Sequence, residues 1–351
     1  MEGLLGKTLS ELQEVAVAVG LPKFAGKQLA EWLYVRRVRS FDEMTNISLK
    51  GRAALAESYF IGRHKPVKEA TSVDGTRKFL FGIQNTDRIA DKIQTNQYIE
   101  SVYIPEEDRS TLCVSTQAGC KMGCRFCMTG TLGFHGHLSA ADILNQIFEV
   151  DALIGGELTN LVYMGEGEPM DNIDNVLRSL EVMTATYGCA WSPKRITVSS
   201  VGIISGLKRF IDESECHLAI SLHNPFAIER QQVMPAEKMC AISDVIALLK
   251  QYDWSHQRRV SFEYICWSGL NDTPRHAKEL LRLLRGLPCR INLIRFHEGA
   301  GEDTFHSSSE EHMEWFRDYL TEHSITTTIR RSRGEDILAA CGQLVNALNN
   351  K

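Results

Sequence analysis

The segment GCKMGCRFCMTG, residues 119–130, places Cys120, Cys124 and Cys127 in the spacing CxxxCxxC on a glycine-bearing loop. Three thiolates on one short loop can each bind one iron of a four-iron, four-sulfur cluster, which leaves the fourth iron without a protein ligand. An iron with an open position can be chelated by the amino and carboxylate groups of S-adenosylmethionine (SAM). The spacing therefore predicts a cluster with one open iron.

A zinc site is the alternative for these cysteines. Structural zinc prefers four closed ligands, usually from two separated CxxC pairs, and the sequence contains no second pair. His135 or His137 can serve as a fourth ligand, although a loop histidine more often lies at the surface. The spacing favours a cluster over structural zinc or over unrelated cysteines.

Outward from this loop, short apolar strands alternate with amphipathic helices. The predicted strands are 112–115, 161–164, 196–199, 218–222, 261–265, 291–294 and 327–329. The predicted helices are one that begins at Ser139 with Asp142 in capping-box position, and 176–186, 205–211, 245–252, 277–284 and 311–320. Repeated strand-helix units form a parallel sheet or barrel, and ligands collect at the C-terminal ends of its strands. We therefore expect an α/β fold over residues 106–351.

The beginning of the chain has another pattern. Capping boxes at Thr8 with Glu11 and at Ser40 with Glu43 predict helices, and a further helix is expected to hold Leu29, Trp32 and Leu33. Apolar residues then alternate at 79, 81 and 83 and at 102 and 104, which predicts a hairpin whose connection, around 87–97, is long. We expect a helical accessory domain over 1–75 and a hairpin linker over 76–105.

The composition is that of a globular protein. The chain has 351 residues, of which 43% are hydrophobic, and it can bury one large core plus a small accessory domain. The N-terminal sequence lacks the pattern of a signal peptide, and no stretch approaches 18 uninterrupted apolar residues, so we expect a cytoplasmic protein with no membrane contact. In that compartment its ten cysteines are not expected to form a structural disulfide framework.

The net charge of −5 argues against a protein that holds nucleic acid by charge alone. Residues 1–70 nevertheless carry eleven Lys or Arg against eight Asp or Glu, a net +3, which leaves −8 for the remainder. A basic end on an acidic body fits contact with a polyanion, but a solvated helix face explains it equally well.

The cysteine loop and its surroundings carry a resemblance to a known family. The segments are TLCVSTQAGC (111–120), GEGEP (165–169), RITVSS (195–200), AISLH (219–223), INLIRF (291–296) and RGEDILAACGQL (333–344). Over nearly its whole length the chain resembles the RlmN/Cfr family of radical SAM enzymes, and within it the branch that methylates C2 of an adenine in 23S rRNA and in tRNA. The resemblance implies a partial (β/α)6-type radical SAM barrel, SAM as cofactor, and a 4Fe-4S cluster on Cys120, Cys124 and Cys127.

The resemblance also implies which residues hold SAM. They are Gly167 and Glu168 for the amino group, Ser199 for the carboxylate or ribose, Ser221, Leu222 and His223 for the ribose and adenine region, and Asn292 for the nucleoside. Carboxylate, hydroxyl and amide groups can satisfy these parts of SAM, and glycine allows close approach. One position departs from the family, whose members usually carry methionine where this chain has Glu166. A carboxylate there either strengthens binding of the cationic sulfonium or points to solvent.

Two further cysteines match the family's methyl chemistry. An aromatic C2 carbon is not activated for direct methyl displacement, and in the family one SAM methylates a cysteine while a second SAM yields a radical that removes hydrogen from the S-methyl group. Cys341 matches the methylated cysteine. Cys113 matches the resolving cysteine, which forms a transient disulfide with Cys341 and releases the product. Glu100 matches the proton acceptor. Other cysteines are expected to be buried apolar residues, namely Cys189, Cys216, Cys240, Cys266 and Cys289.

The sequence leaves two alternatives open. A Cfr-type enzyme that methylates C8 of the same adenine needs the same cysteines and cluster. From another class, the chain could be a non-catalytic, metal-stabilised RNA-binding protein. The resemblance implies 23S rRNA and tRNA as partners and an electron donor for the cluster, and we expect a monomer. The basic N-terminal region, and Arg330, Arg331 and Arg333 ahead of Cys341, are the candidate RNA contacts.

Overall fold

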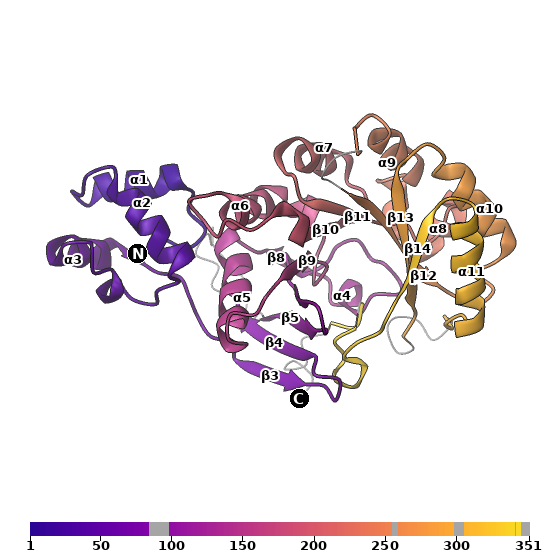
Figure 1. Ribbon diagram of the computed structural model, residues 1–351, viewed down its shortest axis with the longest axis horizontal. Coiled ribbons are helices and arrows are strands. Elements are labelled where there is room, and N and C mark those ends of the chain that lie inside the picture. Colours follow the sequence, from indigo (N-terminus) through magenta and orange to yellow (C-terminus); the bar gives the residue numbers. More distant parts are fainter. Residues whose placement is uncertain (84–97, 255–258, 298–304, 341, 345–351) are drawn as a thin grey trace.

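A computed structural model describes residues 1–83, 98–254, 259–297, 305–340 and 342–344. The N-terminal helices lie at one end of the molecule, and a large sheet with its covering helices forms the rest (Figure 1). In these ranges no helix has the length and apolar character needed to cross a membrane.

The N-terminal region is helical, as the sequence predicts. It contains the helices α1 (Leu9–Ala18), α2 (Ala25–Ala30) and α3 (Leu49–Ser58), a π-helical turn over Glu31–Val35 and a short 3-10 turn over Phe41–Glu43. Both predicted capping boxes form, at Thr8 with Glu11 and at Ser40 with Glu43, but the second begins only the three-residue 3-10 turn, so the helix predicted from Ser40 is wrong. Two short parallel strands, β1 (Glu2–Gly3) and β2 (Tyr59–Phe60), bring the two ends of this region together.

A ten-stranded sheet organises the rest of the described chain, in the order β14-β13-β12-β11-β10-β9-β6-β5-β4-β3. Its parallel part consists of β6 (Ser110–Cys113), β9 (Asn160–Tyr163), β10 (Ile196–Ser200), β11 (His217–Ser221), β12 (Val260–Cys266), β13 (Cys289–Arg295) and β14 (Thr326–Arg330). Each corresponds to one predicted strand. The predicted hairpin is β4 (Arg77–Gly82) with β5 (Tyr98–Pro105), and β3 (Lys68–Thr71) adds an edge strand that the sequence pattern did not reveal. Its expected connection, around 87–97, lies outside the described residues.

The hairpin is part of the main sheet, because β5 pairs with β6 and places Val102 opposite Cys113. The parallel part of the sheet has helices on its outer side (Figure 1). They are α5 (Ala140–Leu153), α6 (Ile173–Thr184), α7 (Ile204–Glu213), α9 (Ile242–Leu249), α10 (Pro274–Leu283) and α11 (Glu310–Glu322). The predicted capping box at Ser139 with Asp142 begins α5. The short α8 (Ala227–Val233) was not predicted.

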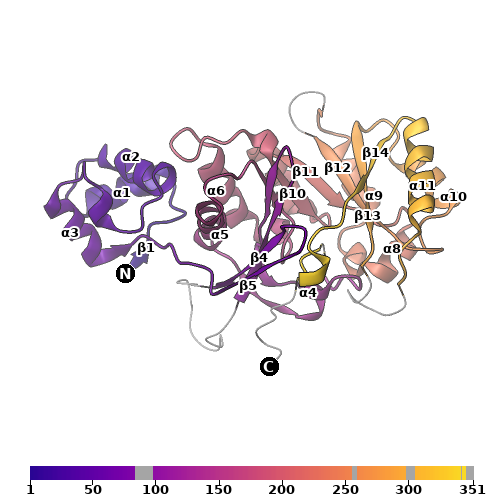
Figure 2. The same cartoon turned by 60° about the horizontal axis from the view of Figure 1, so that its bottom comes forward.

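Helices α5 and α6 lie between the N-terminal helices and the sheet (Figure 2). Helix α5 is therefore buried along most of its length, including its acidic residues Glu149 and Asp151. Buried apolar side chains from the N-terminal region and from the sheet form one continuous core.

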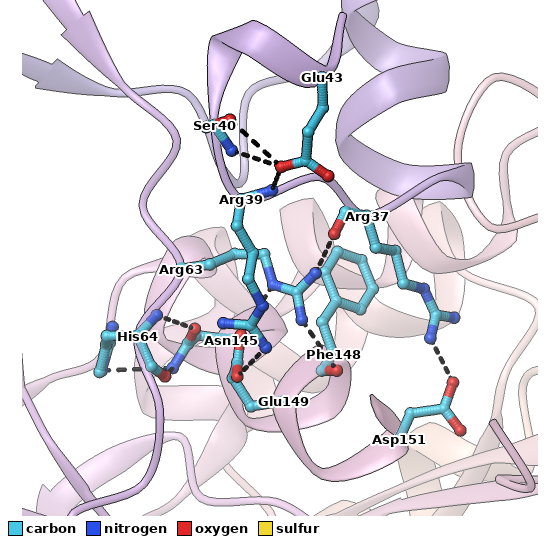
Figure 3. Close-up of polar contacts among 10 residues, drawn as sticks. All are labelled: Arg37, Arg39, Ser40, Glu43, Arg63, His64, Asn145, Phe148, Glu149 and Asp151. Carbon is cyan, nitrogen blue, oxygen red and sulfur yellow. Dashed lines mark hydrogen bonds and ion pairs between the residues drawn. The ribbon is translucent and has the colours of Figure 1, made fainter. Parts of the chain in front are cut away.

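Three arginines attach the N-terminal region to α5 (Figure 3). Arg63 lies 2.8 Å from Glu149, Arg39 donates to the same carboxylate over 2.6 Å, and Arg37 pairs with Asp151. The side chains of Arg63 and Glu149 are only 3% and 1% exposed. These three positive charges, which belong to the basic excess of residues 1–70, thus neutralise carboxylates of the same chain.

Candidate active site

The cysteine loop is framed by a small two-stranded sheet of β7 (Gln117–Gly119) and β8 (Phe134–His137), and it leads into the short helix α4 (Met128–Thr131). Gly119 has a φ of +67°, and a Cβ atom there would lie 1.8 Å from the carbonyl oxygen of Gly133. The amide of Cys120 donates to that same oxygen over 3.0 Å. Only glycine allows this close approach, which fixes the start of the loop.

Cys120, Cys124 and Cys127 carry free, half-buried thiols in apolar surroundings. The buried side chains around them include Met122, Phe126, Met234 and Trp267. Burial raises the pKa of the Cys120 thiol to about 12, and burial together with the neighbouring thiolates raises the pKa of Cys124 well above its ordinary value. Such thiols ionise when a metal takes the place of the proton.

The donor set is suited to iron and sulfur, because it consists of three soft thiolates on one loop in an apolar setting. Each thiolate of a cubane cluster binds a different iron, so the three sulfur atoms need not converge on one point. In the described ranges no three His, Cys, Asp or Glu side chains are arranged to hold a single metal ion.

Most of the predicted SAM residues lie at or just after the C-terminal ends of β9, β10 and β11, whereas Asn292 is the middle residue of β13. Gly167 has a φ of +97°, and a Cβ atom there would lie 2.4 Å from the Gln117 side chain. The carboxylate of Glu168 accepts the amides of Met170 and Val201 over 2.9 and 2.8 Å. Burial raises the pKa of Glu168 to about 7. Its position is therefore fixed by main-chain donors, and the remaining lone pairs can receive an ammonium group.

A fully buried arginine that sequence reasoning missed holds these strand ends together. Arg230 of α8 forms an ion pair with Glu237 inside the protein. Its guanidinium also donates to the main-chain carbonyls of Val201, Ser221, Leu222 and Cys240. In the sequence this ion pair is indicated only weakly, by an Arg and a Glu that are seven residues apart on either side of Pro235. The positive charge also favours the thiolate form of Cys124.

The segment after β11 adopts a strained conformation. His223 has a φ of +55°, a region that costs a non-glycine residue energy and that clusters at functional sites. Its Nδ1 accepts the Ile265 amide over 3.1 Å, and its carbonyl accepts the Asn271 side chain over 2.6 Å. The side chain of the preceding Leu222 is buried in the core, so this predicted residue can offer SAM apolar contact only.

Asn292 belongs to a polar chain across three neighbouring strands. Its amide nitrogen donates to Glu263 over 2.8 Å, and its oxygen accepts the Thr328 hydroxyl over 2.8 Å. Arg330 approaches the other oxygen of Glu263 to 3.3 Å. Glu263, which sequence reasoning also missed, thus orients the predicted nucleoside contact. Ser199 and Ser221 are half-buried on the adjacent strands β10 and β11.

Glu100 lies buried on β5 and pairs with Lys78 over 3.2 Å. Lys78 in turn donates to the Leu338 carbonyl over 3.3 Å, which places Glu100 close to the segment before Cys341. The amide of Glu100 donates to Glu166 over 2.8 Å, and the other oxygen of Glu166 accepts the Gly119 amide over 3.2 Å. Glu166 therefore neither points to solvent nor adds a free charge for a sulfonium, because it is buried and joins β5 to the cysteine loop.

Cys113 and the segment around position 341 line one cavity. Cys341 itself lies outside the described residues, but its neighbours Ala340 and Gly342 line a cavity of about 610 Å³ together with Cys113 and Cys127. The carbonyl of Gly342 accepts the Met128 amide over 2.7 Å. The structure thus brings the cluster loop, Cys113 and both neighbours of Cys341 together. No two of the nine described cysteines are joined to each other by a disulfide.

The chain matches two family models and many curated relatives. The model described as the ribosomal RNA large subunit methyltransferase N-terminal domain matches residues 3–61, and that of the radical SAM superfamily matches residues 114–284. A probable dual-specificity RNA methyltransferase RlmN from Bacteroides fragilis is 56% identical over 98% of this chain and 96% of its own length. The dual-specificity RNA methyltransferase RlmN of Syntrophobacter fumaroxidans is 39% identical over 96% of each chain.

A solved structure extends the similarity to three dimensions. The crystal structure of a radical SAM methyltransferase from Sphaerobacter thermophilus matches with a TM-score of 0.87 and 36% identity, over 98% of this chain and 99% of the other. The expected mixed α/β radical SAM fold is thereby confirmed.

Proposed function

Because the chain belongs to the RlmN family of radical SAM RNA methyltransferases, we propose that it methylates C2 of an adenine in 23S rRNA and in tRNA through a methylated Cys341. The enzyme class and its two cofactors, a 4Fe-4S cluster and SAM, follow from this membership.

Cys120, Cys124 and Cys127 would hold the cluster, since their thiols fit it in number and chemistry. When bound, this group supplies the electron that cleaves SAM and starts the radical reaction. Glu168, Ser199 and Asn292 would bind SAM. Glu168 acts electrostatically on Cys120 and Cys124, Ser199 lies near the end of β10, and Asn292 lines the cavity that Cys127 also lines. Arg230 keeps the ends of β10 and β11 in position.

The methyl group would pass through Cys341. Its thiolate would attack the methyl of one SAM, and S-adenosylhomocysteine would leave. The methyl carbon would give one hydrogen atom to the 5′-deoxyadenosyl radical from a second SAM and then bond to the ring carbon, and the odd electron of that adduct would return to the oxidised cluster. Glu100 accepts the ring proton. The thiolate of Cys113 then attacks the Cys341 sulfur, the carbon-sulfur bond breaks with its electron pair on carbon, and that carbon takes a proton. The disulfide left between Cys113 and Cys341 is reduced by cellular thiols.

One observation carries these assignments. The cavity that Cys113 lines is also lined by Cys127 of the cluster loop and by both chain neighbours of Cys341. Cys113 is largely buried and packs against Ala339 and Leu344 of the C-terminal segment. A cysteine with only a structural role in the sheet would not have to lie near the cluster loop and the segment around position 341.

The test is Cys113→Ala with Cys216→Ala as control, because Cys216 is a buried cysteine outside this cavity. The Cys113 variant should keep iron content and Cys341 methylation but accumulate RNA joined to Cys341 by a bond that survives denaturation and thiol reductants. The control should turn over normally. An inactive Cys113 variant with a full cluster and no protein-RNA adduct contradicts the resolving role, and nucleoside analysis of the wild-type product separates C2 from C8.

Contacts to the RNA would come from exposed cations at two places. We propose that residues 1–75 form an RNA-binding domain through the lysines that the junction with α5 leaves exposed, which are Lys23, Lys27, Lys50, Lys65 and Lys68. The second place is the cavity, which is lined by the exposed Arg331 and by Arg333, a half-buried residue 4.0 Å from Asp74. Phosphate contacts of this kind position the nucleic acid without reading its sequence.

A further inference from the structure

A row of cations stands at the end of the barrel opposite to the cysteine loop. Arg109, Lys194, Arg259 and Arg290 lie at the N-terminal ends of the strands β6, β10, β12 and β13. All four are exposed. All four also line the cavity that Cys113 and Cys127 line. The row is therefore part of the wall of the cavity in which we propose that the reaction takes place.

The sheet brings three of these cations close together. Neighbouring strands of a sheet are about 4.8 Å apart. Since β10, β11, β12 and β13 are successive neighbours, Lys194, Arg259 and Arg290 lie within roughly 15 Å along the edge of the sheet. The register places Arg290 opposite Ser261. The amide of Arg259 donates to Nδ1 of His217, the first residue of β11, over 3.0 Å. His217 thus fills the position between the cations.

Three of the four cations in this row have no ion-pair partner among the described residues. Arg109 pairs with Glu106, but no carboxylate of the described residues forms an ion pair with Lys194, Arg259 or Arg290. The described lining of the cavity contains seven Lys or Arg residues and a single acidic residue, Glu106. In a chain whose net charge is −5, such a surface is a local concentration of positive charge.

The titration of neighbouring groups agrees with this positive potential. Burial, followed by the charges of Arg290 and Arg109, lowers the pKa of Arg259, and the charge of Glu263 opposes this only in part. Burial and the charges of Arg259, Lys194 and Arg290 lower the pKa of His217 to about 4, so His217 is neutral at pH 7. Among the described residues, Glu106 pairs with Arg109 and Glu263 acts on Arg259 from a distance, but neither forms an ion pair with Lys194, Arg259 or Arg290, so the row keeps a net positive charge.

We propose that Lys194, Arg259 and Arg290 bind the phosphodiester backbone of the RNA substrate beside the nucleotide whose base enters the cavity. This inference rests on the proposed function. A base that reacts inside a protein must be unstacked into a pocket, and its flanking phosphates then run along the pocket wall. Three cations spread along an edge suit a chain of phosphates better than one small anion, which needs converging donors.

The experiment compares two triple variants with equal changes of net charge. One is Lys194→Gln, Arg259→Gln and Arg290→Gln. The control is Lys208→Gln, Arg282→Gln and Arg317→Gln, on the outer helices α7, α10 and α11. The dissociation constant of a tRNA transcript is measured between about 50 and about 200 mM salt, a range over which phosphate contacts change affinity strongly.

The first triple variant should lower the slope of log affinity against log salt by about 2, because each single-stranded phosphate contact contributes roughly 0.7. The control should keep the wild-type slope. The charge-preserving variant Lys194→Arg, Arg259→Lys and Arg290→Lys should also keep it. SAM-dependent methylation of Cys341, which needs no RNA, should be unchanged in all three.

A wild-type slope in the first triple variant overturns the inference. An equal loss of slope in the control variant also overturns it. A third contradicting result is that the three substitutions abolish the binding of inorganic phosphate but leave the affinity for RNA unchanged. If the triple variant does not fold, each single Gln variant should still lower the slope by about 0.7. Failure of the wild-type protein to bind RNA at all would instead contradict the proposed function.

Discussion

Gly342 follows the proposed methyl carrier directly, and the structure needs a glycine there. Its φ is +82°, and a Cβ atom would lie 3.2 Å from the Phe126 carbonyl oxygen. We expect Gly342→Ala to cost on the order of 1 to 2 kcal/mol of local stability and to slow Cys341 methylation several-fold, because the strained backbone and the crowding against Phe126 shift the segment away from the cluster loop. Mass spectrometry of the purified protein measures the methyl group.

The control for this variant is Gly269→Ala. Gly269 has a similar φ of +72°, but no atom lies within 4 Å of the place that a Cβ would take, so the substitution brings the same backbone strain without crowding. Equal methylation of Cys341 in both variants would show that the close approach at Gly342 is unimportant.

Glu166 gives a prediction for pH. Burial raises its pKa from the ordinary value of 4.5 to about 8, partly with the help of the Glu100 charge. The folded protein therefore binds a proton that the unfolded chain has released, and this contribution to stability is complete below pH 4.5 and is lost as pH rises through about 8. We expect the free energy of unfolding to fall over this window in the wild type and to fall less in Glu166→Gln.

The same variant should be less stable than the wild type at about pH 6, by roughly 1 to 3 kcal/mol. Glu166 accepts two main-chain amides, and a glutamine side chain can accept only one with its oxygen while its NH2 group faces the other. Thermal unfolding from about pH 5 to about pH 9 tests both expectations. Parallel pH curves for the two proteins would show that Glu166 does not titrate in this range.

Among the elements, helix α8 has only seven residues, but its Arg230 holds the ends of two strands in place. Arg230→Met removes the partner of the buried Glu237 and should cost about 3 to 5 kcal/mol. The double variant Arg230→Met, Glu237→Leu should recover part of this stability, since it leaves no unpaired charge at this site. It should still bind SAM more weakly, because the carbonyls of Val201 and Ser221 lose their donor. Thermal unfolding and equilibrium SAM binding separate the two effects, and wild-type SAM affinity in the double variant would make Arg230 a purely structural residue.

Elements with a regular local pattern could be predicted from the sequence. Each predicted strand and helix of the main domain has a counterpart, since alternation and helical spacing are properties of neighbouring residues. Contacts between distant residues could not be predicted in this way. Glu149 and Asp151 look like a solvated helix face, but their arginine partners lie 86 to 114 residues away. Arg230 and Glu166 bind main-chain groups, which have no signature in a sequence.

At the scale of the whole molecule, the junction of the N-terminal region with α5 gives the next prediction. Arg63→Ala leaves Glu149 buried with only the exposed Arg39 as partner, so we expect a loss on the order of 3 kcal/mol and faster hydrogen exchange in α1 to α3. The control Arg36→Ala removes an exposed pair with Glu31 and should cost no more than about 1 kcal/mol. Unchanged exchange in the Arg63 variant would show that the apolar core alone holds the two parts together.

The C-terminal segment returns to the turn between β3 and β4, near the other end of the sheet order. Asp336 accepts the Ser72 hydroxyl, and the Gly334 amide donates to Asp74 over 3.0 Å, across 264 and 260 residues of chain. Contacts of such long range form late in folding, because the entropy of closing the loop is lost before they stabilise anything. We therefore expect the stretch that carries Cys341 to dock after the sheet has formed, and its thiol to be open to oxidation for longer during folding than the cysteines of the sheet.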